Sequence, residues 1–337
     1  MLFFGPITRI EPKLVLSAIV TVFVALGALS IGPAALSMSD LWNALIGADS
    51  GSDGASLVLW SLRMPRVVLA LLVGATLALA GATLQALYRN PLADPALLGI
   101  SSGAAMLVAL GIVVVPSLST RLGQPILAFA GGMGAMALVA RLGTRGGKTD
   151  VGVMLLAGIA VNALAAAVIG CAFVFANDPE LRSVIFWTLG SFAQAGQKHL
   201  LWSAPLLLFG AGALMLGHRA LDALSLGEAD AHHLGFDVER AKRRILLACA
   251  LSVGAGVASV GVIGFVGLVV PHMVRLWIGP AHRALLPLSA ILGGALLVVA
   301  DSAARAIVPP LEIPVGIFTA LMGAPFFLLL LARRSAW

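Results

Sequence analysis

The chain has 337 residues, of which 60% are hydrophobic and only 11% are charged. Soluble domains carry about 25% charged residues, so this composition excludes an ordinary globular enzyme, a disordered chain and a nucleic-acid binder. Because about 20 apolar residues cross a bilayer as a helix, the sequence predicts an all-α polytopic membrane protein. The formal net charge of +6 comes from Lys and Arg between apolar runs, a pattern typical of membrane topology.

Ten apolar runs predict ten transmembrane helices. They cover residues 14–36, 67–87, 95–115, 122–140, 151–176, 199–217, 245–263, 265–279, 284–306 and 313–332. The seventh and eighth are continuous in sequence, and as one helix they would reach about 51 Å, far more than a hydrocarbon core of about 30 Å. We therefore expect a break among Gly261, Gly264 and Gly267. The first run is longer than the apolar region of a signal peptide, which favours a retained helix over a cleaved leader.

The basic residues predict the orientation. If the N-terminus is cytoplasmic, most of the 21 Lys and Arg fall on the cytoplasmic side, as the positive-inside rule requires. Both termini are then cytoplasmic, and the loop 32–62 lies outside. The longest basic loop, 218–244, lies inside.

An internal repeat appears when the chain is shifted by 180 residues. The shift aligns Val73, Gly74, Ala78 and Gly81 with Val253, Gly254, Ala258 and Gly261, and Pro91 and Gly99 with Pro271 and Gly279. The matched segments are the second and seventh crossings, which run in opposite directions. They predict two inverted five-helix halves, approximately 1–180 and 181–337, an arrangement found in transporters. Chance similarity between Ala- and Gly-rich helices is the alternative.

Several kinds of chemical site can be looked for among the motifs of the sequence. The segment 143–149 ends in Gly-Lys-Thr but has Leu142 where a phosphate-binding loop needs its first Gly, so we interpret it as a flexible basic loop and expect no ATPase in this chain. No His pair is placed to bracket a haem, and no metal site is expected. Asp301 and Arg305 lie one turn apart and predict an ion pair, with a proton relay as the alternative.

The loop 218–244 is a candidate for coupling to another protein. Its sequence predicts two short helices separated by Gly235, with Ala229 and Leu234 presented among charges. Such a segment suits docking in a groove of a partner, and a solvated loop is the alternative.

A resemblance to a known family rests on motifs in order along the chain. They are Arg63-Met-Pro-Arg66, the segment 85–95 with Asn90-Pro-Leu92, and the segments 98–104, 155–158, 186–191, 264–272 with Arg275, 279–283 and 311–316. Together they resemble the permease subunits of ATP-driven importers for iron siderophores, haem and cobalamin. The whole chain, 1–337, is then one transmembrane permease domain and not an enzyme.

The resemblance also implies partners. They are a second copy of the chain, two ATPase subunits that bind ATP and Mg, a periplasmic binding protein and membrane lipid, all at a bacterial inner membrane. No nucleic acid is expected, and no cofactor is expected in this chain.

Site residues follow from the same resemblance. It assigns Arg63, Arg66 and Arg305 to binding-protein docking, Asn90 and Leu92 to a cytoplasmic gate, Ala229, Leu234 and Gly235 to ATPase coupling, and Asn162, Thr319 and Met322 to the translocation path. We expect the docking guanidinium groups to be exposed, since they would pair with carboxylates of the partner; a membrane-anchor role or pairing with Asp301 is the alternative. For the gate the alternative is a Pro turn that ends a helix, and for the path it is packing between helices of one subunit. A second gate departs from the family pattern, because Val151 and Gly152 stand where hydroxyl residues can occur.

Haem is the expected cargo, because the segments 90–95 and 101–103 look more like those of haem permeases. Ferric siderophore and cobalamin are the alternatives within the family. An ion-coupled secondary carrier is the alternative from another class, and a membrane enzyme is disfavoured because no nucleophile or metal motif appears.

Overall fold

The computed structural model describes residues 11–32, 37–46, 53–118, 123–309 and 311–334. Ten apolar helices coincide with the ten predicted crossings. They are α1 (Glu11–Ser30), α4 (Met64–Leu87), α5 (Ile100–Val114), α6 (Gly123–Gly143), α7 (Val151–Phe175), α9 (Gln197–Leu216), α12 (Val238–Val260), α13 (Val266–Ile278), α14 (His282–Ala306) and α15 (Val315–Arg334). Within the described residues seven helices are long and apolar enough to cross a membrane, and α5, α13 and α15 contribute shorter apolar stretches. The all-α membrane fold is confirmed.

Shorter elements connect these helices. They are α2 (Met38–Ile46), α3 (Asp53–Leu57), the π-helical turn Val58–Arg63, the 3₁₀ turns Pro95–Leu98 and Pro116–Leu118, α8 (Asp178–Thr188), α10 (His218–Leu226), α11 (Glu228–His233), and the strands β1 (Thr144–Arg145) and β2 (Lys148–Thr149). The π-helical turn joins α3 to α4 without a loop. The segment that enters α4 therefore projects far beyond the bundle.

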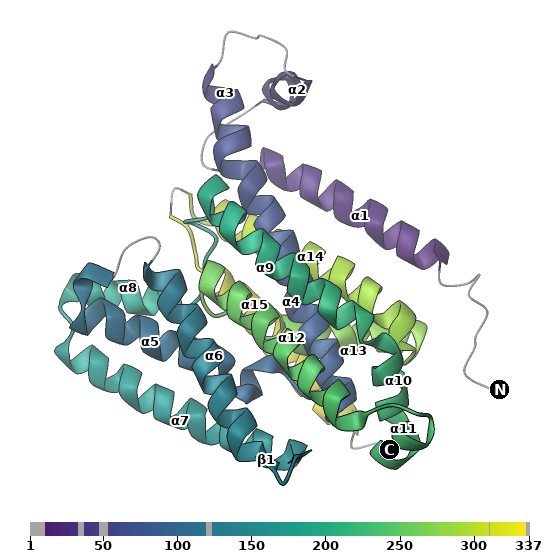
Figure 1. The fold of residues 1–337 in the computed structure, drawn as a ribbon. Coiled ribbons are helices and arrows are strands. Elements are labelled where there is room, and N and C mark those ends of the chain that lie inside the picture. The colour runs from purple at the N-terminus through teal and green to yellow at the C-terminus, as the bar shows by residue number, and fades with distance from the viewer. Residues whose placement is uncertain (1–10, 33–36, 47–52, 119–122, 310, 335–337) are drawn as a thin grey trace.

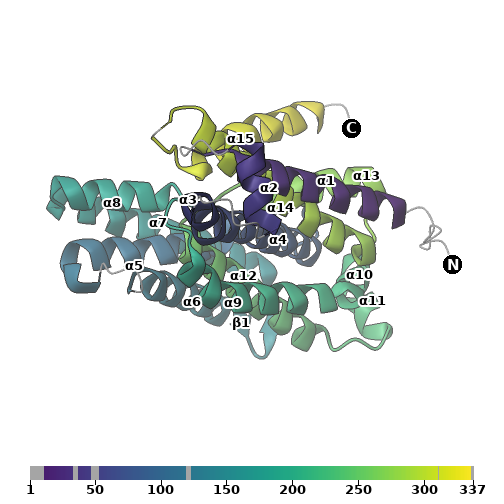
Figure 2. The same ribbon diagram turned by 90° about the horizontal axis from the view of Figure 1, so that it is seen from above.

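The helices form two groups that lie side by side in both views (Figures 1 and 2). One group surrounds α4, which packs against α9, α12, α13 and α14. The other contains α5, α6, α7 and α8, and α6 joins the groups by packing on α12. The helices α4, α12 and α14 are mostly buried, whereas α1, α7 and α9 leave many apolar side chains exposed. That exposure suits a lipid environment.

Small residues bring two of the most buried helices, α4 and α14, together. A Cβ atom on Gly74 of α4 would lie 2.2 Å from the carbonyl oxygen of Gly293 of α14, and a Cβ atom on Gly293 would lie 2.4 Å from the carbonyl oxygen of Gly74. No side chain fits at either position, so the backbones of α4 and α14 touch. Close approach of this kind is how helices associate inside a bilayer, where burial from water provides little driving force.

The connecting elements define two opposite ends of the bundle (Figure 1). We call the end that carries α2, α3 and the turn Val58–Arg63 the α3 end. The opposite end carries the β1–β2 strands, α10 and α11, and we call it the hairpin end. Residues 1–10 and 335–337 lie outside the described residues, so the predicted location of both termini stays a prediction.

The predicted repeat agrees with the directions of two helices but not with the positions of all the residues that it aligns. The helices α4 and α12 start at opposite ends of the bundle and run in opposite directions, as two inverted halves would require (Figure 1). Gly81 lies inside α4, however, whereas its counterpart Gly261 ends α12 with φ +78. Pro91 lies in a turn and Pro271 inside α13. The division into halves 1–180 and 181–337 stays a prediction.

Two predictions about where helices end can be compared with the structure. The predicted break is confirmed, because α12 ends at Val260 and α13 begins at Val266. The separation of two short helices by Gly235 is wrong: Gly227, with φ +135, separates α10 from α11, and Gly235, with φ +87, separates α11 from α12. Either glycine can end a helix in this way, so the sequence alone does not show which of the two separates the short helices.

The basic loop 143–149 is also more ordered than predicted. It forms an antiparallel hairpin in which Thr144 pairs with Thr149 and Arg145 with Lys148. Gly146 and Gly147 have φ +56 and +79, the positive values that a two-residue hairpin turn requires at both central positions. The glycines that would suggest a flexible loop are therefore the residues that shape the turn.

Candidate functional site

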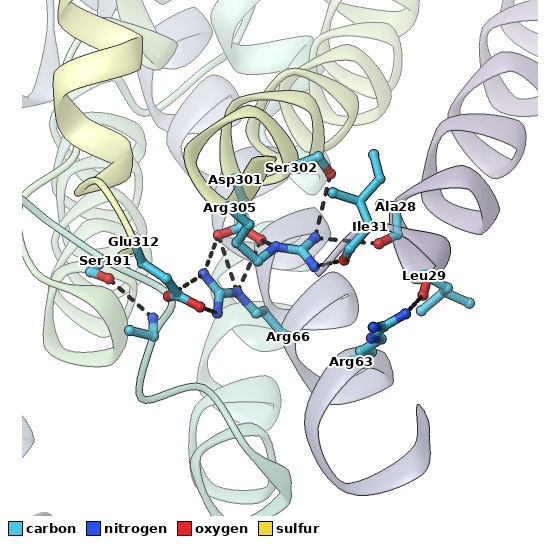
Figure 3. A network of polar contacts seen from close by, with 11 residues as sticks. Ala28, Leu29, Ile31, Arg63, Arg66, Ser191, Asp301, Ser302, Arg305 and Glu312 are labelled. Carbon is cyan, nitrogen blue, oxygen red and sulfur yellow. Dashed lines mark hydrogen bonds and ion pairs between the residues drawn. The ribbon is translucent and has the colours of Figure 1, made fainter. Parts of the chain in front are cut away.

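A cluster of buried charges lies at the α3 end, and Figure 3 shows Arg66 at its centre. The Arg66 guanidinium donates to Asp301, with Nη2 2.8 Å from Oδ1, and to Glu312, with Nη1 3.0 Å from Oε1. Asp301 also accepts from Nε of Arg305, which lies 3.1 Å from Oδ2. The predicted ion pair between Asp301 and Arg305 is confirmed. The cluster ties the start of α4 to the end of α14 and to the segment before α15.

Two arginines of the α3 end also cap the C-terminal end of α1. Arg305 donates to the carbonyl oxygens of Ala28, at 3.3 Å, and of Ile31. Arg63 donates to the carbonyl oxygen of Leu29 at 2.6 Å. The last carbonyls of a helix have no partner within the helix, and here guanidinium groups satisfy them, as Figure 3 shows.

The expectation of exposed docking arginines is therefore wrong. Arg63 and Arg305 are only 5% and 4% exposed, and the side chain of Arg66 is 11% exposed. Their guanidinium groups are occupied by carboxylates and carbonyls of the same chain. Within the cluster three arginines face two carboxylates, while α2 and α3 at the same end carry Asp40 and Asp53. Docking of a binding protein stays a prediction.

The proposed gate residues lie in the turn after α4, at the hairpin end. The backbone N–H of Leu92 donates to Oδ1 of Asn90 at 3.0 Å, a local bond that stabilises a turn. Asn90 is exposed and Leu92 is half-buried. Below them, the buried Gln85 accepts from Nη1 of Arg275 at 2.9 Å and donates to the carbonyl oxygen of Leu268 at 3.2 Å. The last turn of α4, which precedes these residues, is thereby fixed to α13. Their role as a gate stays a prediction.

The proposed coupling residues form the tip of the hairpin end. Ala229 is exposed on α11, Leu234 is 60% exposed, and Gly235 is exposed beside it. The three predicted residues thus lie together on one accessible segment.

An ionic junction connects this segment to the β1–β2 strands. Lys242 is 2% exposed, and its Nζ lies 2.7 Å from Oε1 of Glu228 and 3.3 Å from Oε1 of Glu239. The same Nζ donates to the carbonyl oxygen of Thr149 at 3.0 Å, and the N–H of Thr149 donates to Oε2 of Glu239 at 2.9 Å. A displacement of α11 would therefore act directly on the hairpin and on the start of α7.

A second junction connects α10 to α14. Oδ1 of Asp222 lies 2.7 Å from Nδ1 of His282 and 2.9 Å from its backbone N. Since an ionised carboxylate only accepts hydrogen bonds, Nδ1 carries the proton. Burial raises the pKa of Asp222, but the hydrogen bonds and charge of His282 outweigh it and hold that pKa below its ordinary value.

The proposed path residues are not brought together within one subunit. Asn162 on α7 is half-buried, and its Nδ2 donates to the carbonyl oxygen of Ala96 at 3.1 Å, while its Oδ1 accepts from Ser102. Thr319 on α15 is 3% exposed and donates within its own helix. Met322 is 51% exposed. Of the three, Met322 alone presents a largely accessible side chain.

Comparison with known proteins relates this architecture to transporters. The FecCD transport family model matches residues 19–333. The chain belongs to the FecCD transport family. It is 43% identical over 332 residues to the hemin transport system permease protein HmuU of Yersinia pestis, covering 97% of each chain. It is 44% identical over 284 residues, 84% of this chain and 75% of the relative, to the cobalamin import system permease protein BtuC of Halobacterium salinarum.

A solved structure supports the same conclusion. It shows an inward-facing conformation of a chain assigned to the metal-chelate type of ABC transporter. The two chains match with a TM-score of 0.85 and 30% sequence identity, over 96% of this chain and 99% of that one. Together with the family match, this makes the chain an ABC importer permease of the FecCD family and a multi-span membrane protein.

In this FecCD permease, the sequence reasoning missed three linking residues. Gln85 and Arg275 both stand in recognised motifs but had no assigned role, and Lys242 was read only as part of a basic loop. The missed helix α8 had a local signal: Asn177 and Glu180 form a capping box, with the Asn177 side chain accepting from the Glu180 N–H and the Glu180 carboxylate from the Asn177 N–H.

Proposed function

We propose that this FecCD permease imports haem across the bacterial inner membrane, using ATP hydrolysed by a separate subunit. The observation that carries the proposal is its likeness to a hemin permease over nearly the full length of both chains. The likeness to a cobalamin permease extends over less of that protein. Ferric siderophore and cobalamin are the alternative cargoes.

The hairpin end is proposed to face the cytoplasm and to receive two ATPase subunits, which bind ATP and Mg. Ala229, Leu234 and Gly235 would enter the ATPase surface, because they are the exposed tip of a segment fixed by Lys242 and Asp222. With this orientation both termini are cytoplasmic. The α3 end then faces the periplasm and receives the binding protein.

A second copy of the chain is proposed to complete the path. The apolar helix α7 is largely uncovered, with Leu156 68% and Phe175 80% exposed, and Leu321 on α15 is 66% exposed. If the α7 and α15 faces of two copies met, Asn162, Thr319 and Met322 would lie near one axis. Their weakly polar side chains suit passage of a large cargo without tight binding.

Transport by the reconstituted complex tests the proposal. The permease, its ATPase and its binding protein are placed in proteoliposomes, and uptake of haem, a ferric siderophore and cobalamin is compared with and without ATP. We expect ATP-dependent accumulation of haem above that of the other two cargoes. A variant ATPase that binds but cannot hydrolyse ATP serves as the matched control.

Two results would redirect the proposal. Preferential uptake of a siderophore or of cobalamin would replace the cargo and keep the mechanism. Accumulation under a proton or sodium gradient without ATPase would identify an ion-coupled secondary carrier instead.

A further inference from the structure

A groove of about 750 Å³ lies at the hairpin end, outside the residues assigned above, between α9, α10 and the start of α12. Much of its lining is apolar and accessible. Phe209 and Leu216 of α9 are 70% and 85% exposed, and Leu247 of α12 is 63% exposed. Helix faces of this kind are expected to contact acyl chains.

The mouth of the groove is basic. Arg219 of α10 and Arg240 and Arg244 of α12 line it. Arg240 pairs with Asp237, with Nε 3.0 Å from Oδ2, and both side chains are more than half exposed. Arg219 and Arg244 are exposed, and neither guanidinium group forms a hydrogen bond or an ion pair with any residue that the structure describes. Three arginines against the one aspartate of the lining leave an excess of two positive charges.

The charges lie where the helices pass from polar to apolar sequence. Arg240 and Arg244 are one helical turn apart and therefore share a face. Arg244 directly precedes Ile245, where the apolar part of α12 begins. An anion held by these guanidinium groups would thus lie at headgroup depth, and anything attached to it would enter the apolar groove. A soluble phosphate would leave those apolar walls uncovered.

We propose that this groove binds an anionic phospholipid of the cytoplasmic leaflet. Its phosphate is held by Arg219, Arg240 and Arg244, and an acyl chain lies along Phe209, Leu216 and Leu247. Guanidinium groups bind phosphate with paired hydrogen bonds, and basic pockets between helices on this side of a membrane suit such headgroups. The choice of leaflet rests on the orientation given under the proposed function.

The lipid would also support the coupling segment. Phe236, which follows the exposed tip of that segment, lines the same groove. A chain in the groove would pack against Phe236 and α9, and would thereby hold in place the segment that joins α11 to α12. Anionic lipid is therefore expected to increase the transport obtained per ATP hydrolysed.

Native mass spectrometry of the full-length permease, released from nanodiscs of equal parts phosphatidylglycerol and phosphatidylethanolamine, tests the proposal. We compare wild type with the triple variant R219Q/R240Q/R244Q. The matched control is R141Q/R145Q/R283Q, which removes the same charge from exposed arginines at the same end outside the groove. The groove variant is expected to retain about tenfold less phosphatidylglycerol than wild type, and the control to retain the wild-type amount.

A second variant separates lipid binding from general charge effects. Ala213→Trp fills the groove while all three arginines remain, and it should lower retention as well. Equal retention by both triple variants, retention of phosphatidylethanolamine equal to that of phosphatidylglycerol, or competition by free glycerol phosphate at the lipid's own concentration would each overturn the proposal. Lipid retention is measured without cargo or ATPase, so a failure here is distinct from a failure of the proposed transport function.

Discussion

Asp301 is the residue on which the α3 end depends, because it accepts hydrogen bonds from both Arg66 and Arg305. The sequence predicts the pair with Arg305, which is only four residues away. The contact with Arg66, which is separated by 235 positions, is available from the sequence only as an alternative to docking. Exposure of the arginines is expected from the docking role that the resemblance implies, and their burial becomes understandable only once the carbonyls at the end of α1 are placed beside them.

Removing the Asp301 carboxylate should therefore be costly. Asp301→Ala leaves two buried guanidinium groups with less compensation, and breaking a buried ion pair in this way destabilises proteins by about 3 to 5 kcal/mol. We expect a clear loss in the free energy of unfolding measured by denaturant titration of the purified permease in detergent. Asp178→Ala is the control, since Asp178 is exposed at the start of α8 and should change the value by about 0.5 kcal/mol or less. An equal effect of both substitutions would contradict the role of Asp301.

The Asp222–His282 contact predicts a pH dependence. The pKa of Asp222 is lower in the fold than its ordinary 3.8, so ionised Asp222 contributes stability above that pH, and the contribution is lost as the pH falls through the folded value. Asp222→Asn should therefore melt at a lower temperature than wild type at neutral pH. The difference in melting temperature should shrink as the pH falls below 3.8. A difference that stays constant down to about pH 2 would show that the carboxylate charge is not responsible.

Long apolar runs predicted the ten main helices, because length and hydropathy alone set what can cross a bilayer. Short amphipathic elements escaped this reasoning. The helix α8 carries Asp178, Glu180 and Arg182 and has no long apolar run, although its capping box was readable. The segment of the β1–β2 hairpin is a short connection between two crossings, which predicts a flexible loop, but Gly146 and Gly147 have the positive φ values of turn residues.

The junction at Lys242 gives an element-scale prediction about coupling. Lys242→Met should leave Glu228 and Glu239 without their shared cation and loosen α11 from the hairpin. In the complete transporter we expect ATP hydrolysis to continue while cargo moved per ATP falls several-fold, because motion of α11 would no longer reach the start of α7. Lys198→Met is the control, since Lys198 is exposed at the start of α9, which lies at the α3 end and far from the hairpin end. Loss of hydrolysis and transport in equal proportion would instead indicate failed ATPase docking.

In the proposed dimer, one subunit would supply only part of the transport path. The helices α7 and α15 belong to the two different groups of helices, and each leaves large apolar side chains uncovered. Inverted halves and a family resemblance predicted which helices lie beside the axis, but not the rotation of each helix about its own axis. That rotation is set by packing, and it buries Thr319 while it exposes Met322.

Cysteine accessibility tests this arrangement in the assembled transporter. In a background with Cys171 and Cys249 replaced by Ala, Met322→Cys should react with a water-soluble maleimide at a rate that changes several-fold with the nucleotide state, because an alternating path is open to water in only some states. Leu208→Cys is the matched control: Leu208 is 58% exposed on α9, a helix expected to face lipid, and its reaction should stay slow throughout.

Two further positions make the outcome decisive. Thr319→Cys should remain protected in every state if the packing of α15 is rigid, and should follow Met322→Cys if α15 rotates as the path opens. Asn162→Cys reports on α7, although it also removes the amide that holds the carbonyl oxygen of Ala96. If Met322→Cys is as unreactive as Leu208→Cys with and without nucleotide, the exposed face of α15 meets lipid, and the path must lie elsewhere in the dimer.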